Sequence, residues 1–190
     1  FEKKEDGSLI PLAKPNVVTG MGVERTLVAL NGQRSVYDTE LFKPLFDVLY
    51  ECLATTDQVL SGEEVTKARV ICDHIKASVF IVGDGVEPSN KERGYVLRRL
   101  LRRAMVYAKL MNLKGHWLEA LVGKVVAMYA EVYPYLVDES ERIFKVIETE
   151  QQKFGATLEK GLKEFEKIIG HDSVMPGSDP ASSAKNLDSG

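Results

Sequence analysis

Apolar residues recur at helical spacing along most of the chain. From Gly20 to Asn31 the apolar side chains lie about one turn apart, and Gly32 follows them as a stop signal. The same spacing predicts further helices near residues 41–52, 61–80, 89–111, 117–129 and 138–170. Residues 1–19 favour an extended conformation, with a turn at Asp6-Gly7-Ser8. The pattern therefore predicts a mainly α protein, a helical bundle preceded by a short extended arm.

Polar residues near the predicted helix ends support these boundaries. Two Ser/Glu pairs have the spacing of a capping box, namely Ser61 with Glu64 and Ser89 with Glu92. Asp38 is expected to cap the helix that begins near Leu41, and Gly170 is the expected C-cap of the last helix. The residues after Gly170 are rich in Gly, Ser, Pro, Asp and Asn and predict a loose tail.

Charge is unevenly distributed along the chain. The net charge of −3 argues against nucleic-acid binding over the whole surface, but Lys91–Lys109 alone carries a net +6. One predicted helix in this segment has two i, i+4 pairs of arginines: Arg98, Arg99, Arg102 and Arg103. Like charges this close repel each other, so anions are expected to neutralise them. Phosphates and acidic side chains of the same bundle are both possible, and the nearby Lys91 and Arg93 favour phosphates.

A glycine-rich segment precedes the first helix. Thr19-Gly20-Met21-Gly22-Val23-Glu24-Arg25 stands where an extended stretch becomes a helix. Glycines at such a junction let the backbone approach a ligand closely, and a helix N-terminus favours anions. Arg25, one turn into the helix, is positioned for a terminal phosphate. Taken alone, the segment is a weak indication of nucleotide binding, because turns before helices are often rich in glycine.

Other reactive residue types give no further site. Cys52 and Cys72 lack the spacing of a metal site and are expected to be buried, reduced thiols of an intracellular, cytoplasmic protein. His74, beside Asp73, is expected to be a partly buried histidine. Trp117 and the tyrosines are expected in the core or at its rim, and no apolar run is long enough to cross a membrane.

The glycine-rich segment and the arginine-rich segment together resemble a known family. Thr19–Arg25 is similar to motif 3 of the class II aminoacyl-tRNA synthetases, in the form seen in alanyl-tRNA synthetases. The stretch Asp84–Arg99, with its Pro-Ser-Asn turn, resembles that family nearly residue for residue, as do Arg102-Arg103 and Cys72–Ala77. The resemblance extends from Phe1 to about Gly170.

The resemblance implies an enzyme that activates alanine with ATP and Mg²⁺ and transfers it to tRNA(Ala). It implies that Arg25 acts in catalysis as a contact to the ATP γ-phosphate, and that Gly20 and Gly22 pack against the adenosine. It also implies that Asn90 reads the G3·U70 wobble pair of the acceptor stem. An amide suits this role because it both donates and accepts. The tRNA phosphates would then be held by Lys91, Arg93, Arg98, Arg99, Arg102 and Arg103.

The resemblance also implies how the chain is divided. Residues 1–33 would be the end of an antiparallel-sheet catalytic domain, residues 34–170 a helical tRNA-recognition domain, and residues 171–190 a flexible tail. The family's aspartate for the alanine amino group is replaced by Val18, which cannot pair with an ammonium. Motifs 1 and 2 and the family's zinc site are not in this sequence. We therefore expect a segment of a longer ligase, inactive by itself, with no zinc and no cofactor of its own.

The residues alone also allow a different class of function. A helical interaction module could use the arginine-bearing helix to bind an acidic protein partner. A free-standing ATP-binding enzyme is disfavoured, because a lone motif 3 supplies neither an adenine pocket nor metal-binding carboxylates.

Overall fold

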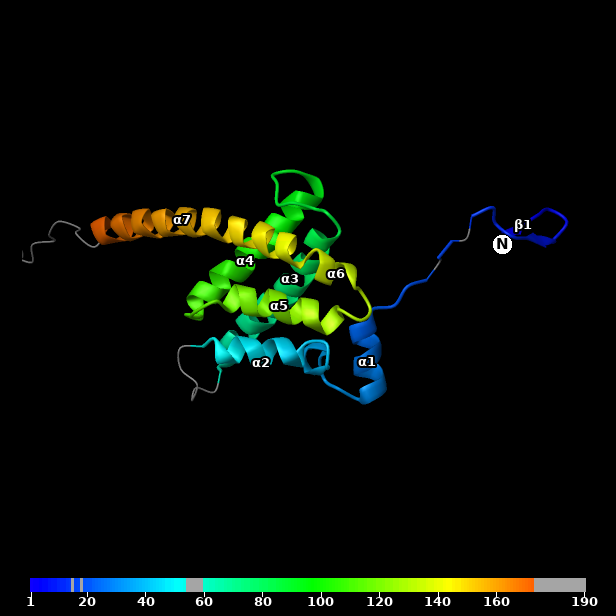
Figure 1. Cartoon of the computed structure of the whole chain (residues 1–190), viewed down its shortest axis with the longest axis horizontal. Coiled ribbons are helices and arrows are strands. Elements are labelled where there is room, and N and C mark those ends of the chain that lie inside the picture. The colour runs from blue at the N-terminus through cyan, green and yellow to red at the C-terminus, as the bar shows by residue number, and fades with distance from the viewer. Residues whose placement is uncertain (15, 18, 54–59, 173–190) are drawn as a thin grey trace, which may run out of the picture.

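The computed structural model describes residues 1–14, 16–17, 19–53 and 60–172, which are mostly helical, as the hydrophobic pattern predicts (Figure 1). None of the helices in these ranges is long and apolar enough to cross a membrane. In chain order the elements are β1 (Glu2–Lys3), β2 (Leu9–Ile10), α1 (Val23–Asn31), the 3₁₀ turn η1 (Val36–Asp38), α2 (Lys43–Glu51), α3 (Gly62–Gly83), α4 (Glu92–Leu110), α5 (Trp117–Tyr129), α6 (Tyr135–Asp138) and α7 (Ser140–Asp172).

The hydrophobic core lies where α2, α4, α5 and the first half of α7 surround α3. Four of the inward positions that the spacing predicts for α3 are buried, namely Ala68, Ile71, Ile75 and Val79. The fifth, Val65, is only partly buried. Leu101 of α4, Leu121 of α5 and Ile147 of α7 are buried against these four residues. Burying such a side chain stabilises the fold by about 1.5–3 kcal/mol. The helical periodicity of the sequence is therefore the reason for this packing.

The central helix α3 begins after the predicted capping residue Ser61 and runs past the predicted end near residue 80. Ser61 Oγ accepts from the Glu64 N–H, and the Ser61 N–H donates to Glu64 Oε2 at 2.8 Å, so this capping box is confirmed. The helix ends at Gly83. A methyl group there would lie 2.8 Å from a Leu136 side-chain carbon, so the close packing of α6 requires glycine at this position.

Two predicted boundaries are wrong. Asp38 does not cap α2 but belongs to η1, whose N-cap is Ser35, and α2 begins after Phe42 with Pro44 in its first turn. Proline lacks an N–H and has a helix-compatible φ, so it fits the start of a helix. Gly170 is not a C-cap, because α7 continues to Asp172.

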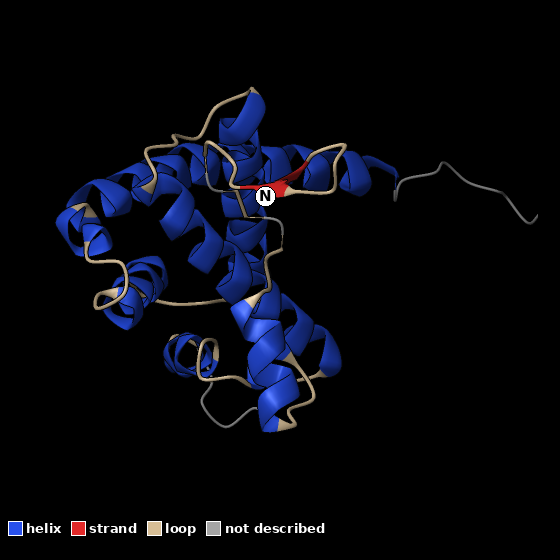
Figure 2. Ribbon diagram, turned by 90° about the vertical axis from the view of Figure 1, so that its right-hand side faces the viewer, coloured by secondary structure: helices blue, strands red, loops and turns tan. Residues whose placement is uncertain are grey.

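The N-terminal arm is a short hairpin followed by an extended segment. Glu2 pairs with Ile10 in an antiparallel register, and the predicted turn is present: Gly7 has a φ of 83° and the Ser8 N–H donates to Asp6 Oδ1 at 2.8 Å. The hairpin lies away from the helices in Figure 1, and its strands are red in Figure 2. The arm therefore contributes nothing to the helical core.

Helix α7 extends beyond the bundle. Its first half packs on the core, whereas its second half projects outward in Figure 1. The apolar positions follow this change: Ile147 is fully buried, Leu162 is 39% exposed and Phe165 is 59% exposed. The predicted apolar stripe is real, but only its first half meets the bundle.

Candidate nucleic-acid interface and motif 3 segment

The loop between α3 and α4 is held against the first turn of α4. The Ser89 backbone N–H donates to the Gly94 carbonyl oxygen at 3.0 Å. Gly94 is buried, and a methyl group there would lie 2.3 Å from Ser89 Oγ and 2.4 Å from the Glu87 carbonyl oxygen. Protein interiors have no room for such contacts. Glycine at position 94 therefore allows the loop to close over the helix.

The predicted capping box of Ser89 and Glu92 does not form. Ser89 Oγ donates to the Lys91 carbonyl oxygen at 2.9 Å and accepts from the Lys91 N–H at 3.3 Å. The N-cap of α4 is Lys91, which makes no side-chain cap bond, and Glu92 has a φ of 48°. The hydroxyl thus closes a tight turn over residues 89–91, and the first helical residue takes a left-handed conformation that is costly for glutamate.

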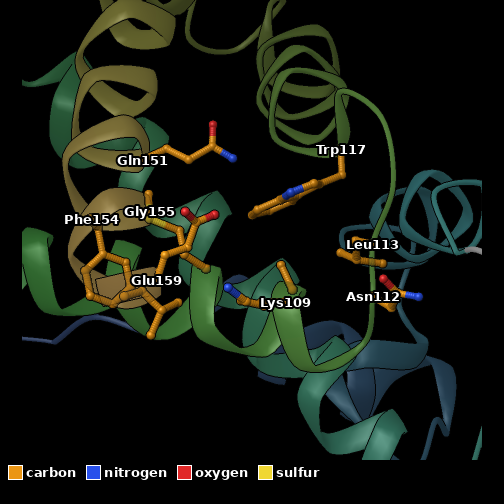
Figure 3. A pocket seen from close by; sticks show the side chains of 11 residues that line it. Lys109, Asn112, Leu113, Trp117, Gln151, Phe154, Gly155 and Glu159 are labelled. Atoms are coloured by element: carbon orange, nitrogen blue, oxygen red, sulfur yellow. The ribbon is translucent and has the colours of Figure 1, made fainter. Parts of the chain in front are cut away.

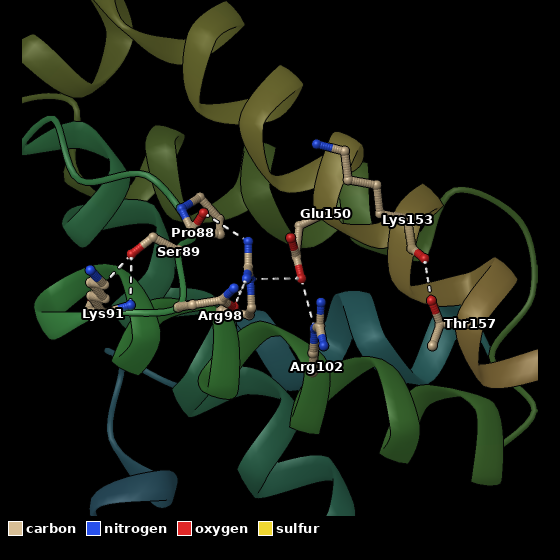
Figure 4. A network of polar contacts seen from close by, with 9 residues as sticks. Pro88, Ser89, Lys91, Arg98, Arg102, Glu150, Lys153 and Thr157 are labelled. Carbon is tan, nitrogen blue, oxygen red and sulfur yellow. Dashed lines mark hydrogen bonds and ion pairs between the residues drawn. The ribbon is translucent and has the colours of Figure 1, made fainter. Parts of the chain in front are cut away.

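Asn90 lies exposed at the tip of this turn. Its amide oxygen accepts a hydrogen bond from Nη1 of Arg98, and Nη2 of Arg98 donates to the Pro88 carbonyl oxygen at 3.1 Å. One guanidinium therefore fixes both the Asn90 side chain and the loop backbone. Figure 4 shows its hydrogen bond to Pro88. Because an amide oxygen has two lone pairs, Arg98 leaves one acceptor position of Asn90 open, together with the NH₂ donors.

A buried carboxylate lies within ion-pair distance of the same guanidinium. Glu150 of α7 is only 4% exposed, and its Oε1 accepts from Nε of Arg102 at 2.7 Å and lies 3.5 Å from Nε of Arg98. Figure 4 shows both arginines turned toward Glu150. Their side chains keep 23% (Arg98) and 39% (Arg102) exposure. Two of the four arginines thus share one carboxylate of the bundle, which offsets one of their two positive charges.

The other two arginines face a different way. Arg99 and Arg103 are exposed, and within the described residues neither has a carboxylate in ion-pair range. The Arg103 guanidinium lies 5.6 Å from the centre of the Tyr107 ring. Lys91 and Arg93, in the first turn, are exposed as well. The four arginines therefore form two faces of α4 instead of one.

The motif 3 segment is open to solvent. Gly22 is the N-cap of α1, and Gly20, Gly22 and Arg25 are all exposed. A methyl group on Gly20 would have no atom within 4 Å, so a ligand could approach the backbone there. Val18 lies outside the described residues. Within those residues, no hydrogen bond or ion pair joins Arg25 to Asn90, Arg98 or Arg102.

A buried lysine ties α1 to the bundle. Lys76 of α3 is 8% exposed, and its Nζ donates to Oε1 of Glu24 at 2.7 Å. The ammonium also lies 4.4 Å from the Phe42 ring centre and 5.4 Å from that of Tyr129. Burial lowers the pKa of Lys76, but the contacts with Glu24 and Tyr129 outweigh it and raise the pKa overall. The hydrogen bond from Lys76 lowers the pKa of Glu24.

Sequence reasoning missed the roles of Glu150 and Lys76, although each leaves a signal. Glu150 falls in the apolar stripe of α7, between Ile147 and Phe154, and Lys76 falls between Ile75 and Val79. A charged residue at an inward position must be paired, because an isolated buried charge is costly. The partner, however, lies on another helix and has no fixed sequence spacing.

The remaining predicted residues take structural positions. Trp117 is 7% exposed and forms one wall of a hollow of about 260 Å³ between α4 and α7 (Figure 3), as expected of a core residue. His74 is largely buried, with Nδ1 3.1 Å from Asp73 Oδ2.

Both cysteines are free thiols. Cys72 is buried, which raises its pKa to about 12, whereas Cys52 is only partly buried. No group of three or more potential metal ligands occurs within the described ranges.

Comparison with known proteins agrees with the resemblance seen in the sequence. The family model of class II (A) tRNA synthetases matches residues 1–180. An alanine–tRNA ligase of Elusimicrobium minutum (strain Pei191) is 40% identical over 169 residues, which are 89% of this chain and 19% of the relative. Another, of Treponema pallidum (strain Nichols), is 40% identical over 185 residues, 94% of this chain and 30% of the relative.

A third relative has the same extent of similarity. The alanine–tRNA ligase of Magnetococcus marinus is 40% identical over 169 residues, 89% of this chain and 19% of its own length. The chain thus spans between 19% and 30% of these three relatives. By the family match and these identities, the chain belongs to the class II (A) tRNA synthetases, as a segment similar to part of the alanine–tRNA ligases.

Proposed function

We propose that this chain is the acceptor-stem recognition segment of an alanine–tRNA ligase. Such an enzyme first joins alanine to ATP, releasing pyrophosphate and forming an adenylate, and then transfers alanine to the 3′ end of tRNA(Ala). The support is the similarity to ligases of that name over 89% of the chain. The residues that would serve each step lie on different parts of the structure.

Asn90 is the proposed reader of the G3·U70 pair, and the observation that carries the proposal is how it is held. Its side chain is exposed while its loop is locked by Gly94 and Arg98. Recognition of a base pair needs such a rigid polar group, because a mobile side chain would lose conformational entropy on binding. The open acceptor position and the NH₂ donors suit the groups that a wobble pair exposes.

The tRNA phosphates would be held mainly by the exposed cations of α4. Lys91, Arg93, Arg99 and Arg103 have no carboxylate partner within the described residues that would compete with a phosphate. Arg98 and Arg102 share the carboxylate of Glu150, so they contribute positive charge and position the loop. Phosphate contacts fix the register of an RNA, and base contacts give specificity.

The motif 3 segment would contribute to ATP binding in the longer ligase. The exposed backbone at Gly20 and Gly22 has room for adenosine, and the exposed Arg25 guanidinium suits the γ-phosphate. Mg²⁺ would arrive with the ATP. This role places Arg25 in the adenylate step and Asn90 in the choice of tRNA.

Titration with RNA hairpins tests the proposal. The chain is titrated with acceptor-stem hairpins that carry G3·U70 or G3·C70, at several salt concentrations. We expect tighter binding of the G3·U70 hairpin and an affinity that falls steeply with salt. A hairpin-sized acidic peptide serves as competitor. Equal affinity for both hairpins contradicts the proposal. Binding of the peptide in place of either hairpin also contradicts it and favours a protein partner.

A further inference from the structure

A hollow of about 350 Å³ lies between the loop that carries Asn90 and helices α4 and α7. Its lining includes Glu87 and Pro88 from the loop, Arg98 from α4, and four charged side chains of α7. These are Arg142, Lys145, Glu150 and Lys153, so the lining carries four cations and two carboxylates. Figure 4 shows the Lys153 side chain extending along α7 toward Glu150. The hollow adjoins the proposed reader, because Arg98 lines it and also binds Asn90.

The cations of this hollow are not all neutralised by the protein. Arg98 is near Glu150, and Arg142 pairs with Glu139 and donates to the Val82 carbonyl oxygen at 2.8 Å. Lys145 and Lys153 are exposed, and no carboxylate of the described residues lies within ion-pair distance of either ammonium. The two lysines therefore give the hollow positive charge that an anion can neutralise.

The linear sequence conceals this charge. Helix α7 has more acidic than basic residues, so no basic run marks it. Lys145 and Lys153 are eight positions apart, which places them about 12 Å apart along the helix. They face the hollow because the α7 face that carries them packs beside the Pro88 loop. Only the packing of α7 on α4 brings them to the same hollow as Pro88 and Arg98.

We propose that this hollow binds the sugar-phosphate backbone of the acceptor-stem RNA, with Lys145 and Lys153 as its phosphate contacts. The inference rests on the proposed function. An RNA whose base pair lies at Asn90 must run its backbone past the adjacent loop, and the hollow offers unneutralised ammonium groups there. Ammonium groups on flexible stems bind phosphates as point charges and need no exact geometry. The RNA interface then spans α4 and α7.

A pair of double variants tests this in the full chain. Lys145→Gln with Lys153→Gln removes two charges in the hollow, and Lys160→Gln with Lys163→Gln removes two exposed charges from the same helix, beyond it. We expect only the first variant to weaken G3·U70 hairpin binding several-fold. Its slope of log affinity against log salt should fall by about 0.7–0.9 for each lost contact. Thermal unfolding of both variants should match that of the unmodified chain.

The outcomes separate this inference from the proposed function. If the unmodified chain prefers the G3·U70 hairpin and both double variants bind it equally well, the hollow is not an RNA site, and the proposed function stands. If the unmodified chain binds neither hairpin, both proposals are wrong. The chain could instead bind the acidic peptide and neither hairpin. If Lys145→Gln with Lys153→Gln then weakens peptide binding, the hollow serves a protein partner and the inference is overturned.

Discussion

The side-chain amide of Asn90 is shared between the protein and the solvent. Arg98 occupies one lone pair of its oxygen, while the rest of the amide faces outward. An asparagine at the start of a helix often serves as its N-cap. Here the N-cap is Lys91 and uses no side-chain bond, so Asn90 has no capping role to lose. Helix capping therefore does not explain its position, and its exposed amide groups are available for the proposed recognition.

Replacing Asn90 by alanine separates recognition from stability. Asn90→Ala should narrow the affinity difference between G3·U70 and G3·C70 hairpins, because the reading group is gone. Its free energy of unfolding should change by less than about 1 kcal/mol, since one exposed hydrogen bond is lost. Hairpin titration and thermal unfolding measure the two effects. Asn31→Ala, an exposed change on α1, is the control. A full G3·U70 preference in Asn90→Ala would exclude the reader role.

At the scale of elements, Gly94 decides whether the loop can close over α4. Gly94→Ala places a methyl group against the Glu87 backbone, so we expect a loss of about 1–3 kcal/mol in stability and weaker discrimination between the hairpins. Gly123→Ala in α5 is the matched control, because a methyl group there meets no atom within 4 Å. That change should be stabilising by roughly 0.5–1 kcal/mol. Chemical denaturation of both variants measures the contrast; equal stabilities would mean that the loop does not require glycine.

The attachment of α1 to α3 depends on pH through Glu24 and Lys76. The pKa of Glu24 is lowered from 4.5, so its stabilising effect is present above that value and lost as pH falls through the lowered pKa. The pKa of Lys76 is raised from 10.5, so its effect is present below that value and lost as pH rises through the raised pKa. The contact should therefore persist between these limits.

Backbone NMR shifts of α1, followed over pH, measure this attachment. In the unmodified chain we expect them to move together at the acidic limit, as Glu24 becomes protonated. In Glu24→Gln the acidic transition should disappear, because glutamine does not titrate. Glu40→Gln, an exposed change outside the contact, should leave it in place. An acidic transition that survives in Glu24→Gln would assign the attachment to another group.

At the scale of the whole molecule, the different surroundings of the α4 arginines predict different effects on RNA binding and on stability. Arg99→Gln with Arg103→Gln should flatten the salt dependence of hairpin binding by about 0.7–0.9 per contact and leave stability nearly unchanged. Arg98→Gln with Arg102→Gln should lower the melting temperature, because Glu150 is left buried without its cations. Salt titrations and thermal unfolding of the two double variants distinguish these effects. Equal melting temperatures would show that the Glu150 pairs do not stabilise the bundle.

The sequence by itself determined most of the helices and the family. Hydrophobic periodicity reports which side of a segment is inward, so α1, α3, α5 and the turns at Gly7 and Gly32 follow from local residues. The motif 3 and Pro-Ser-Asn segments determined the family, which the matched relatives confirm. The division near residue 34 and the roles of Arg25 and Asn90 stay predictions.

Tertiary structure alone decided how the charged residues are used. The spacing along α4 places four arginines near one another. The partner of each arginine, however, depends on which helix packs against that side of α4. Glu150 pairs with Arg98 and Arg102, which are 48 or more positions away in the sequence. Glu24 pairs with Lys76, which is 52 positions away. The same packing brings Lys145 and Lys153 beside the Asn90 loop. Helical periodicity is a local property, whereas burial and pairing of charge depend on contacts between segments that no local pattern encodes.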